Sequence, residues 1–147
     1  MTGTFSEGSQ WQPADTVVVA DDDPVLRAVL TYTLHQGGYE VFEAEDGFEA
    51  LRAIRRLTVS VLVTDVVMPR MDGVALTLAA RLLPRTAQLP IVVMTGLPPN
   101  DGRIVRLRGI ERLEVIFKPF SFDDVRRRVD RLAPSASIPP PVAPYVD

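Results

Sequence analysis

Three short runs of almost uninterrupted aliphatic residues constrain the fold of this chain more than any other feature of its sequence. They are TVVVA at Thr16–Ala20, VSVLVT at Val59–Thr64 and IVVMT at Ile91–Thr95. A strand that is exposed on one face alternates apolar and polar residues, whereas a strand covered on both faces of a parallel sheet is apolar throughout. The runs therefore predict the central strands of a parallel sheet with a layer of helices on each face.

Segments with a helical pattern separate these runs from one another and from two further expected strands, Tyr39–Phe42 and Leu113–Phe117. Short polar side chains that accept hydrogen bonds from free backbone N–H groups are typical of a helix start. The helix expected between Asn100 and Gly109 has the weakest pattern. Five strand–helix units in succession predict an α/β fold, a doubly wound parallel sheet with right-handed crossovers. The expected caps are Asp23 (followed by Pro24), Asp46 (with Glu49 three residues later), Asp72, and Ser121 (with Asp124).

Composition divides the chain into a core and two tails. Residues 1–14 carry no periodic hydrophobic pattern, which predicts an N-terminal tail. Residues 133–147 hold five of the 13 prolines, which favours an extended, polyproline-like tail over a helix or a central strand. Residues 15–132 remain for one compact domain of ordinary size. Because only 15 residues follow residue 132, we expect a stand-alone domain without an output domain.

The 147 residues contain no cysteine and a single histidine, His35, and their formal net charge is −3. The lack of cysteine excludes disulfides, thiolate zinc sites, iron–sulfur clusters and cysteine nucleophiles. The mild acidity gives no reason to expect a nucleic acid or a membrane surface as a partner, and no apolar run approaches the roughly 18 residues of a membrane span. With no targeting segment visible in the sequence, we expect a cytoplasmic protein.

Polar residues that could carry chemistry stand at the ends of the expected strands: Asp21 and Asp22 after the first, Asp65 after the third, Thr95 at the end of the fourth, and Lys118 after the fifth. In a doubly wound sheet the functional crevice lies beyond the carboxyl ends of the strands. Crowded carboxylates repel one another unless a cation joins them, and Mg²⁺ is the hard cation that takes one or two carboxylates together with a phosphate oxygen. A carboxylate beside such a metal can act as a nucleophile on phosphorus. Asp23 and Asp72 are better explained as helix caps.

Four sequence blocks, VVVADDDP, VLVTDVVMPRMDG, VVMTG and FKPF, resemble those of the receiver domains of response regulators in two-component signalling. The resemblance covers about residues 15–132. It implies a flavodoxin-like receiver fold with five parallel strands in the order 2-1-3-4-5 and helices on both faces. It also implies that the bond between Lys118 and Pro119 is cis.

The same resemblance implies a role for each residue at the acidic edge. The implied roles are phosphoacceptor for Asp65, switch hydroxyl for Thr95 and phosphate partner for Lys118. The implied ligands of Mg²⁺ (or Mn²⁺) are Asp21, Asp22, Asp65 and the main-chain carbonyl of Val67. Phosphoryl transfer requires from a protein mainly that it positions the reacting groups and neutralises their charge, which these side chains could do.

We therefore expect a response regulator that accepts a phosphoryl group onto Asp65 in a Mg²⁺-dependent reaction. The donor is expected to be the phosphohistidine of a sensor histidine kinase or of a His-phosphotransfer protein. The signal is expected to pass to an unknown downstream protein through altered protein–protein interaction, with the chain a monomer or a weak homodimer. We expect no enzymatic turnover beyond self-catalysed phosphoryl acceptance and slow self-dephosphorylation.

Two alternatives fit parts of the pattern. A phosphorylation-independent, receiver-like interaction module keeps the fold without the switch, and its only support is Val115, which stands where many receivers have an aromatic residue. A Mg²⁺-dependent phosphohydrolase with an aspartyl nucleophile carries D-x-D after its strand, but here Val67 occupies the position of the second aspartate, the general acid. Nucleotide binding is disfavoured, because no glycine-rich phosphate motif follows the first strand.

Two departures from the family pattern concern the switch and the lifetime of the phosphoryl group. The aromatic residue on the last strand is Phe117 rather than residue 115, and strand alternation puts Val115 and Phe117 on the same face. Val67 and Leu97 stand two residues after the phosphoacceptor and the switch threonine, where polar side chains can position an attacking water. Apolar side chains hinder that water, so we expect slow self-dephosphorylation.

Overall fold

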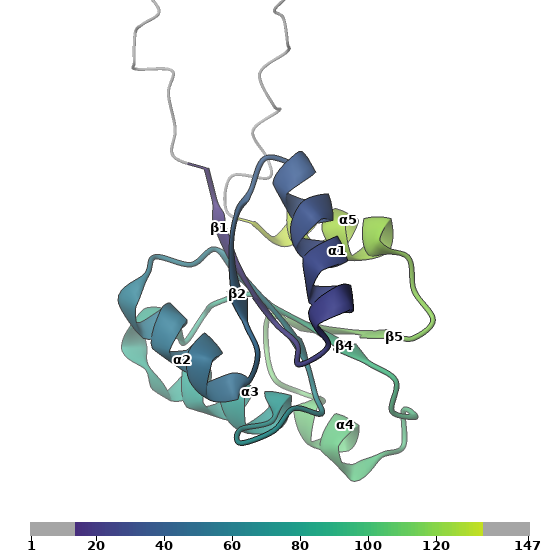
Figure 1. Ribbon diagram of the computed structural model, residues 1–147. Helices are drawn as coiled ribbons and strands as arrows, with labels where there is room; N and C mark the ends of the chain where they lie inside the picture. Colours follow the sequence, from purple (N-terminus) through teal and green to yellow (C-terminus); the bar gives the residue numbers. More distant parts are fainter. Residues whose placement is uncertain (1–13, 134–147) are drawn as a thin grey trace, which may run out of the picture.

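The structure is a computed structural model, and it describes residues 14–133. Five strands and five α-helices alternate along this part of the chain, with one additional 3₁₀ turn, so the α/β architecture predicted from the sequence is confirmed (Figure 1). Except for residues 14 and 133, the two expected tails lie outside the described residues. The bounds are β1 Thr16–Ala20, α1 Pro24–Gln36, β2 Glu40–Ala44, α2 Gly47–Arg56, β3 Val61–Asp65, α3 Gly73–Leu82, η3 Pro84–Thr86, β4 Ile91–Thr95, α4 Gly102–Leu107, β5 Leu113–Phe117 and α5 Phe122–Leu132.

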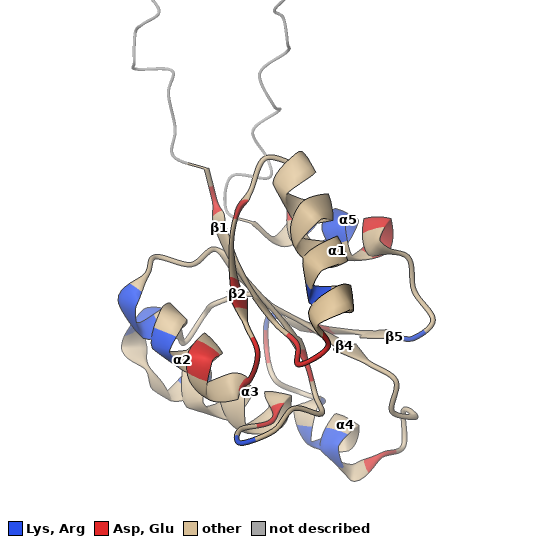
Figure 2. Ribbon diagram, viewed as in Figure 1, with Lys and Arg blue, Asp and Glu red and all other residues tan. Residues whose placement is uncertain are grey.

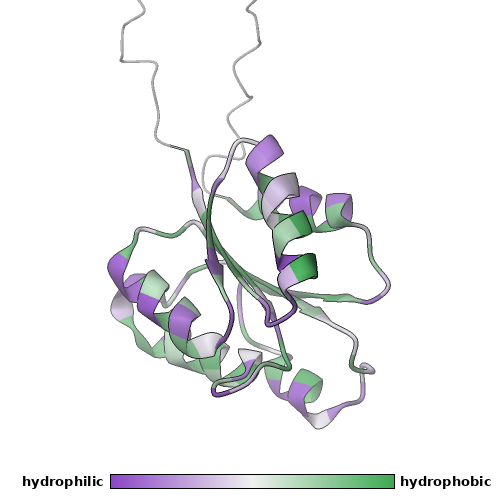
Figure 3. Cartoon of the chain, in the orientation of Figure 1, coloured by the Kyte–Doolittle hydropathy of each residue, from purple (hydrophilic) through white to green (hydrophobic). Residues whose placement is uncertain are grey.

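The five strands form one parallel sheet in the order β2-β1-β3-β4-β5, as the resemblance implied. Helices α1 and α5 cover one face of the sheet, and α2, α3 and α4 cover the other (Figure 1). Alternate side chains of β1 enter two different cores: Val17 and Val19 pack toward α1 and α5, whereas Val18 and Ala20 pack toward the other three helices. This two-sided burial explains why the central strands are apolar along most of their length (Figure 3).

The four expected side-chain caps are present. At the start of α2 the cap is only half of the expected capping box. Asp46 accepts the N–H of Glu49, but the Glu49 carboxylate accepts the N–H of Glu45 rather than that of Asp46. At the start of α5 the capping box is complete. The side chains that accept first-turn N–H groups are Asp23 for α1, Asp46 for α2, Asp72 for α3 and Ser121 for α5.

Two strands and one helix differ in extent from the sequence prediction. β2 begins one residue later than expected and continues to Ala44, because it pairs with β1 along the whole length of both strands. β3 begins at Val61 and includes Asp65, whose backbone is the ladder partner of Met94 in β4. α4 has only six residues, in keeping with the weak helical pattern of its sequence. None of the helices in residues 14–133 is long and apolar enough to cross a lipid bilayer.

The loop between β3 and α3 is held tightly against the end of β3. Gly73 donates its N–H to the carbonyl oxygen of Val66 at 2.7 Å, and a Cβ on residue 73 would lie 2.1 Å from the carbonyl oxygen of Asp65. Only glycine permits this approach. Arg70, which has a φ of 66°, forms an ion pair with the buried carboxylate of Asp46 at the start of α2. These contacts fix the backbone that carries Asp65.

We expect the substitution Gly73→Ala to lower the free energy of unfolding by roughly 2–3 kcal/mol, because the added methyl group must displace the backbone of Asp65. Gly102→Ala is the matched control, since nothing lies within 4 Å of a Cβ at that position. Its stability should be unchanged or higher by up to about 1 kcal/mol, because alanine is the better helix former. Urea unfolding followed by circular dichroism measures both. Wild-type stability for Gly73→Ala would show that the loop can relax away from β3.

Candidate functional site

Three side chains predicted to act together lie on the same side of the sheet, at the carboxyl ends of their strands. Asp21 follows β1, Asp65 ends β3 and Lys118 follows β5. Side chains alternate along a strand, and the residues two positions before these three all belong to the core beneath α1 and α5. Alternation therefore directs all three side chains to one side of the edge, where Figure 2 shows acidic segments in red.

The carboxylates of Asp21, Asp22 and Asp65 have oxygens that all lie within 4.8 Å of one another. Asp21 is 1% exposed and Asp65 is 8% exposed, while Asp22 is exposed. Burial raises the pKa of Asp21 to about 6, against the lowering effect of the Asp23 N–H and with a further rise from the Asp65 charge. Burial likewise raises the pKa of Asp65, against the lowering effect of the Lys118 ammonium. The negative charges of these two neighbouring buried carboxylates are thus only partly compensated.

The carboxylate of Asp21 shows that this cluster fits a divalent cation. Its Oδ1 accepts the N–H of Asp23 at 2.8 Å, whereas its Oδ2 is buried without a hydrogen-bond partner in the described part of the chain. A buried carboxylate oxygen without a donor is costly in free energy. Hard oxygen ligands, typically one or two carboxylates together with water and phosphate oxygens, are the donors that Mg²⁺ takes in proteins. Asp21, Asp22 and Asp65 are therefore the residues that could hold the metal.

Asp65 has one oxygen held by the backbone and another that faces the lysine. Its Oδ1 accepts the N–H of Val66 at 2.7 Å, and its Oδ2 lies 3.8 Å from Nζ of Lys118. That separation is too long for a hydrogen bond, so the ammonium acts on Asp65 as a point charge. Lys118 therefore compensates part of the charge of Asp65 without occupying its oxygen.

Thr95 and Lys118 are connected through the backbone between β4 and β5. Thr95 is fully buried, its hydroxyl accepts the N–H of Leu97 at 3.0 Å, and its carbonyl accepts the N–H of Lys118 at 2.8 Å. A hydroxyl that accepts one bond still has its own hydrogen to donate. The bond between Lys118 and Pro119 is cis, as the resemblance implied. A Cβ on Gly96 would lie 3.6 Å from Cδ of Lys118, so the lysine stem passes directly over this glycine.

The residues that depart from the family pattern lie around this edge. Phe117 is the ladder partner of Thr95 and is partly exposed, whereas Val115 is partly buried against the core beneath α2, α3 and α4. Val67 is half-exposed, and its N–H lowers the pKa of Asp65 by hydrogen bonding to it. The residue whose N–H reaches the carboxylate thus carries a half-exposed apolar side chain. The role of the Val67 carbonyl as a metal ligand stays a prediction.

One residue that was not predicted from the sequence contacts the site, and a second one supports it. Nη1 of Arg27 donates to the carbonyl oxygen of Asp21 at 2.7 Å, and Nε of Arg27 donates to Oε1 of Glu43 at 3.0 Å. Arg27 lies in the first turn of α1, and Glu43 lies in β2, the edge strand next to β1. Nothing in the sequence beyond the presence of a basic residue five positions after Asp22 points to this contact.

Comparison with known sequences decides the family. The sequence profile of the response regulator receiver domain matches residues 17–130. The chain belongs to this family. The receiver is 33% identical over 132 residues to the probable transcriptional regulator ycf27 of Pyropia yezoensis, covering 85% of this chain and 53% of that protein. It is 35% identical over 127 residues to the sensor protein EvgS of Escherichia coli (strain K12), covering 85% of this chain and 10% of that protein.

This receiver thus spans about half of the ycf27 relative and a tenth of EvgS. Among solved structures it is similar to the response regulator TrrA of Thermotoga maritima in complex with Mg²⁺-BeF. The TM-score is 0.67 and the sequence identity is 26%, and the similarity covers 80% of this chain and 98% of that chain. The fold of the receiver and its acidic edge therefore agree with its sequence family.

Removal of the Asp21 charge is expected to stabilise the metal-free receiver at neutral pH. The pKa of Asp21 is raised from 3.8 to about 6, so the folded state holds this proton more tightly than the unfolded state. Protonation of Asp21 therefore makes its full contribution to the free energy of unfolding below pH 3.8, and this contribution is lost as the pH rises through about 6. With EDTA at about pH 7.5, Asp21→Asn should raise the free energy of unfolding by roughly 1–3 kcal/mol.

Urea unfolding at about pH 7.5 and pH 4.5 checks this expectation, since the wild type then serves as its own control. The difference between the Asp21→Asn variant and the wild type should shrink at the lower pH, where the folded wild type is already protonated. A difference that is the same at both pH values would show that the substitution acts through packing rather than charge.

Proposed function

We propose that this receiver accepts a phosphoryl group onto Asp65, in a Mg²⁺-dependent reaction, from the phosphohistidine of a sensor histidine kinase or a His-phosphotransfer protein. The supporting observation is the position of Asp65, which lies 3.8 Å from the Lys118 ammonium and within 4.8 Å of oxygens of Asp21 and Asp22. Receiver domains bind Mg²⁺ at such an acidic site, and the Thermotoga relative was solved in complex with Mg²⁺-BeF. The receiver acts as a phosphorylated switch, with no turnover beyond its own phosphorylation and slow dephosphorylation.

In the proposed reaction an oxygen of Asp65 attacks the phosphorus atom. The P–N bond to the donor imidazole breaks, and its electron pair returns to the ring nitrogen. Lys118 binds one phosphoryl oxygen through its positive charge, and Thr95 donates its hydroxyl hydrogen to another. Mg²⁺, when bound, neutralises the phosphoryl oxygens and orients them. The residues that would hold it are Asp21, Asp22, Asp65 and, through its main-chain carbonyl, Val67.

Phosphorylation changes the receiver through charge. Phosphorylation replaces the single charge of the Asp65 carboxylate by the roughly 1.5 to 2 negative charges of a phosphoryl group, a net gain of about one negative charge at most. Lys118, whose Nζ lies 3.8 Å from Asp65, and Thr95, the switch hydroxyl of the family pattern, are the groups that we expect to respond. The Thr95 hydroxyl is bonded to the N–H of Leu97, so movement of Thr95 toward the phosphoryl group draws the start of the β4–α4 loop with it. The altered surface lies around α4 and β5, and a downstream protein reads it.

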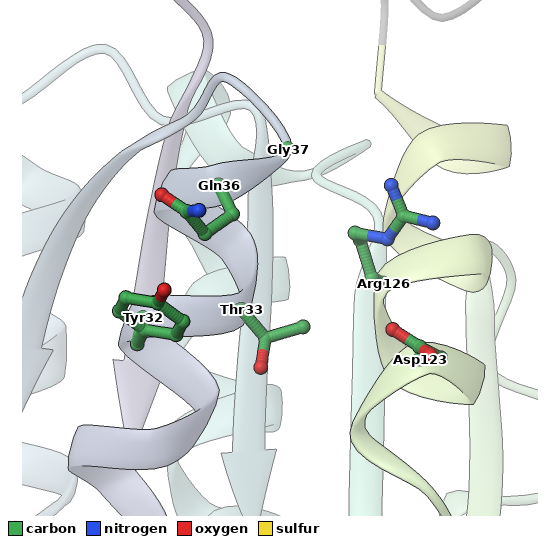
Figure 4. Close-up of a pocket in the computed structure, with 6 residues that line it drawn as sticks. All are labelled: Tyr32, Thr33, Gln36, Gly37, Asp123 and Arg126. Carbon is green, nitrogen blue, oxygen red and sulfur yellow. The ribbon is translucent and has the colours of Figure 1, made fainter.

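The exposed face of α1 is the surface on which we infer that the phosphodonor protein docks. Val25, Val29 and Tyr32 follow one another on successive turns of α1 and are 70%, 40% and 65% exposed. Figure 3 shows the first turns of α1 in green, next to the end of β1 that carries the acidic pair. Further along, the helix borders a groove with α5 that is lined by Tyr32, Thr33, Gln36, Gly37, Asp123 and Arg126 (Figure 4).

The first test of the proposed function is labelling with acetyl phosphate and Mg²⁺, followed by intact mass. We expect the wild type to gain one phosphoryl group and Asp65→Asn to gain none, because the amide cannot form the acyl phosphate. The label should be lost over hours rather than seconds, since Val67 and Leu97 offer no polar group to a hydrolytic water.

The outcomes that contradict the proposal are distinct. Absence of label in the wild type would favour a phosphorylation-independent interaction module. Continuous release of phosphate from the donor would indicate a phosphohydrolase. A label retained by Asp65→Asn would place the phosphoacceptor elsewhere, and decay of the label within seconds would overturn the expected slow self-dephosphorylation.

The docking surface on α1 is tested separately with the substitution Tyr32→Glu. A buried charge in the contact should reduce the rate of phosphotransfer from a phosphorylated donor protein by about tenfold or more. Labelling by acetyl phosphate, which needs no docking surface, should stay at the wild-type rate. Leu82→Glu is the matched control, because Leu82 is 84% exposed on α3 on the opposite face. Equal effects of the two substitutions on protein phosphotransfer would contradict docking on α1.

A further inference from the structure

Asp21 is fixed by hydrogen bonds from three different parts of the molecule. Its N–H donates to the carbonyl oxygen of Ala44 in β2 at 3.0 Å. Its Oδ1 accepts the N–H of Asp23 at 2.8 Å, and its carbonyl oxygen accepts Nη1 of Arg27 at 2.7 Å. Of its four polar groups, only Oδ2 has no partner within residues 14–133. The arrangement leaves a single oxygen of a fully buried carboxylate for a ligand.

We propose that Arg27 is the positioning residue of the cation site. By holding the carbonyl of Asp21 from α1, it fixes the direction in which the Asp21 carboxylate presents Oδ2. The inference rests on the proposed function in that it assumes a divalent cation bound by Asp21, Asp22 and Asp65. Arg27 itself does not touch the metal or the phosphoryl group, and it acts through Asp21.

The position of Arg27 in the chain suits this role. Asp23 caps α1 by accepting the N–H groups of Val25 and Leu26, and its carbonyl accepts the N–H of Arg27 at 3.0 Å. The first turn of α1 and the turn that carries Asp21 therefore form one hydrogen-bonded unit, closed by the Arg27 side chain. That side chain is only 19% exposed, so its place is defined by packing as well as by these bonds.

Glu43 removes the electrostatic disadvantage of an arginine at this point. A guanidinium close to a cation site repels the cation, and binding would weaken if the charge of Arg27 were uncompensated. Oε1 of Glu43 accepts Nε of Arg27 at 3.0 Å, and Glu43 stands opposite Val19 in the β1–β2 ladder. The ion pair of Arg27 with Glu43 uses the planar fork of the guanidinium, with one N–H on the Asp21 carbonyl and another on the Glu43 carboxylate. The negative charge of Glu43 balances the positive charge of Arg27.

A role of Arg27 in positioning and a role through its charge alone predict opposite changes in cation affinity when Arg27 is replaced by alanine. If only charge mattered, removing the positive Arg27 would strengthen cation binding, and keeping the charge in a lysine would leave binding unchanged. If Arg27 positions Asp21, both substitutions weaken binding, because a lysine has no planar fork to reach Asp21 and Glu43 together. Residues that orient metal ligands change metal affinity by roughly 10–100-fold when they are replaced.

The experiment measures the binding of Mn²⁺ alone, by electron paramagnetic resonance or titration calorimetry at about pH 7.5, together with stability in urea. Mn²⁺ takes the same oxygen ligands as Mg²⁺. We expect Arg27→Ala to weaken binding about tenfold and Arg27→Lys to weaken it severalfold. The matched control is Arg85→Ala, which removes a guanidinium that donates to the carbonyls of Arg55 and Leu57 at 2.7 and 3.3 Å, at the C-terminal end of α2.

Each outcome bears on the proposal. Wild-type or tighter binding in Arg27→Ala, or wild-type binding in Arg27→Lys, would overturn it, and so would equal weakening in Arg85→Ala. If Arg27→Ala does not fold, Arg27→Lys alone decides, because the charge-only role predicts no change there. Failure of the wild type to bind Mn²⁺ would overturn the cation site and the proposed function together. Unchanged binding in the Arg27 variants would leave the proposed function intact.

Discussion

The molecule is organised around a concentration of negative charge that its own side chains only partly compensate. Asp21 and Asp65 are buried at the edge where β1 and β3 end, and burial raises the pKa of both. Lys118 supplies a positive charge, but at 3.8 Å from Asp65 rather than in a hydrogen bond. This arrangement lowers the stability of the domain, and the two hydrophobic cores on either side of the sheet offset it. The uncompensated charge is the property that a divalent cation needs.

The two sides of this edge are built differently. On the side of β3, Gly73 packs against the carbonyl of Asp65, and Arg70 is tied to the buried carboxylate of Asp46. On the side of β4, Thr95 leads into a loop and then into α4, which has only six residues. Short helices with few internal hydrogen bonds belong to the less stable parts of a fold. The carboxylate of Asp65 is thus held still, while the segment after Thr95 is free to respond.

Much of the fold could be predicted from the sequence because two-sided burial leaves a clear pattern. The bounds of β1 and β4 follow directly from their apolar runs and those of β5 from its β-branched and aromatic residues, whereas the strand order came from the family resemblance. β2 was less well predicted because it is largely exposed and has glutamates at Glu40 and Glu43, so its ends are set by its ladder with β1 rather than by a hydrophobic pattern. The contact between Arg27 and Asp21 was missed for a related reason. A side chain that donates to a backbone carbonyl leaves no pattern in the sequence, because every residue has such a carbonyl.

Asp21 and Asp65 both follow apolar strands, so the sequence pattern alone does not separate a metal ligand from a nucleophile. Their surroundings do differ. Asp21 is 1% exposed and is held through its N–H, its carbonyl and Oδ1, which suits a ligand that needs only a fixed direction. Asp65 is 8% exposed, and its Oδ2 faces Lys118 without a hydrogen bond. A nucleophile must be approached in line by phosphorus and must have its charge balanced as the bond forms. The nearby ammonium therefore favours Asp65 as the nucleophile, and the three hydrogen bonds that fix Asp21 favour it as a metal ligand.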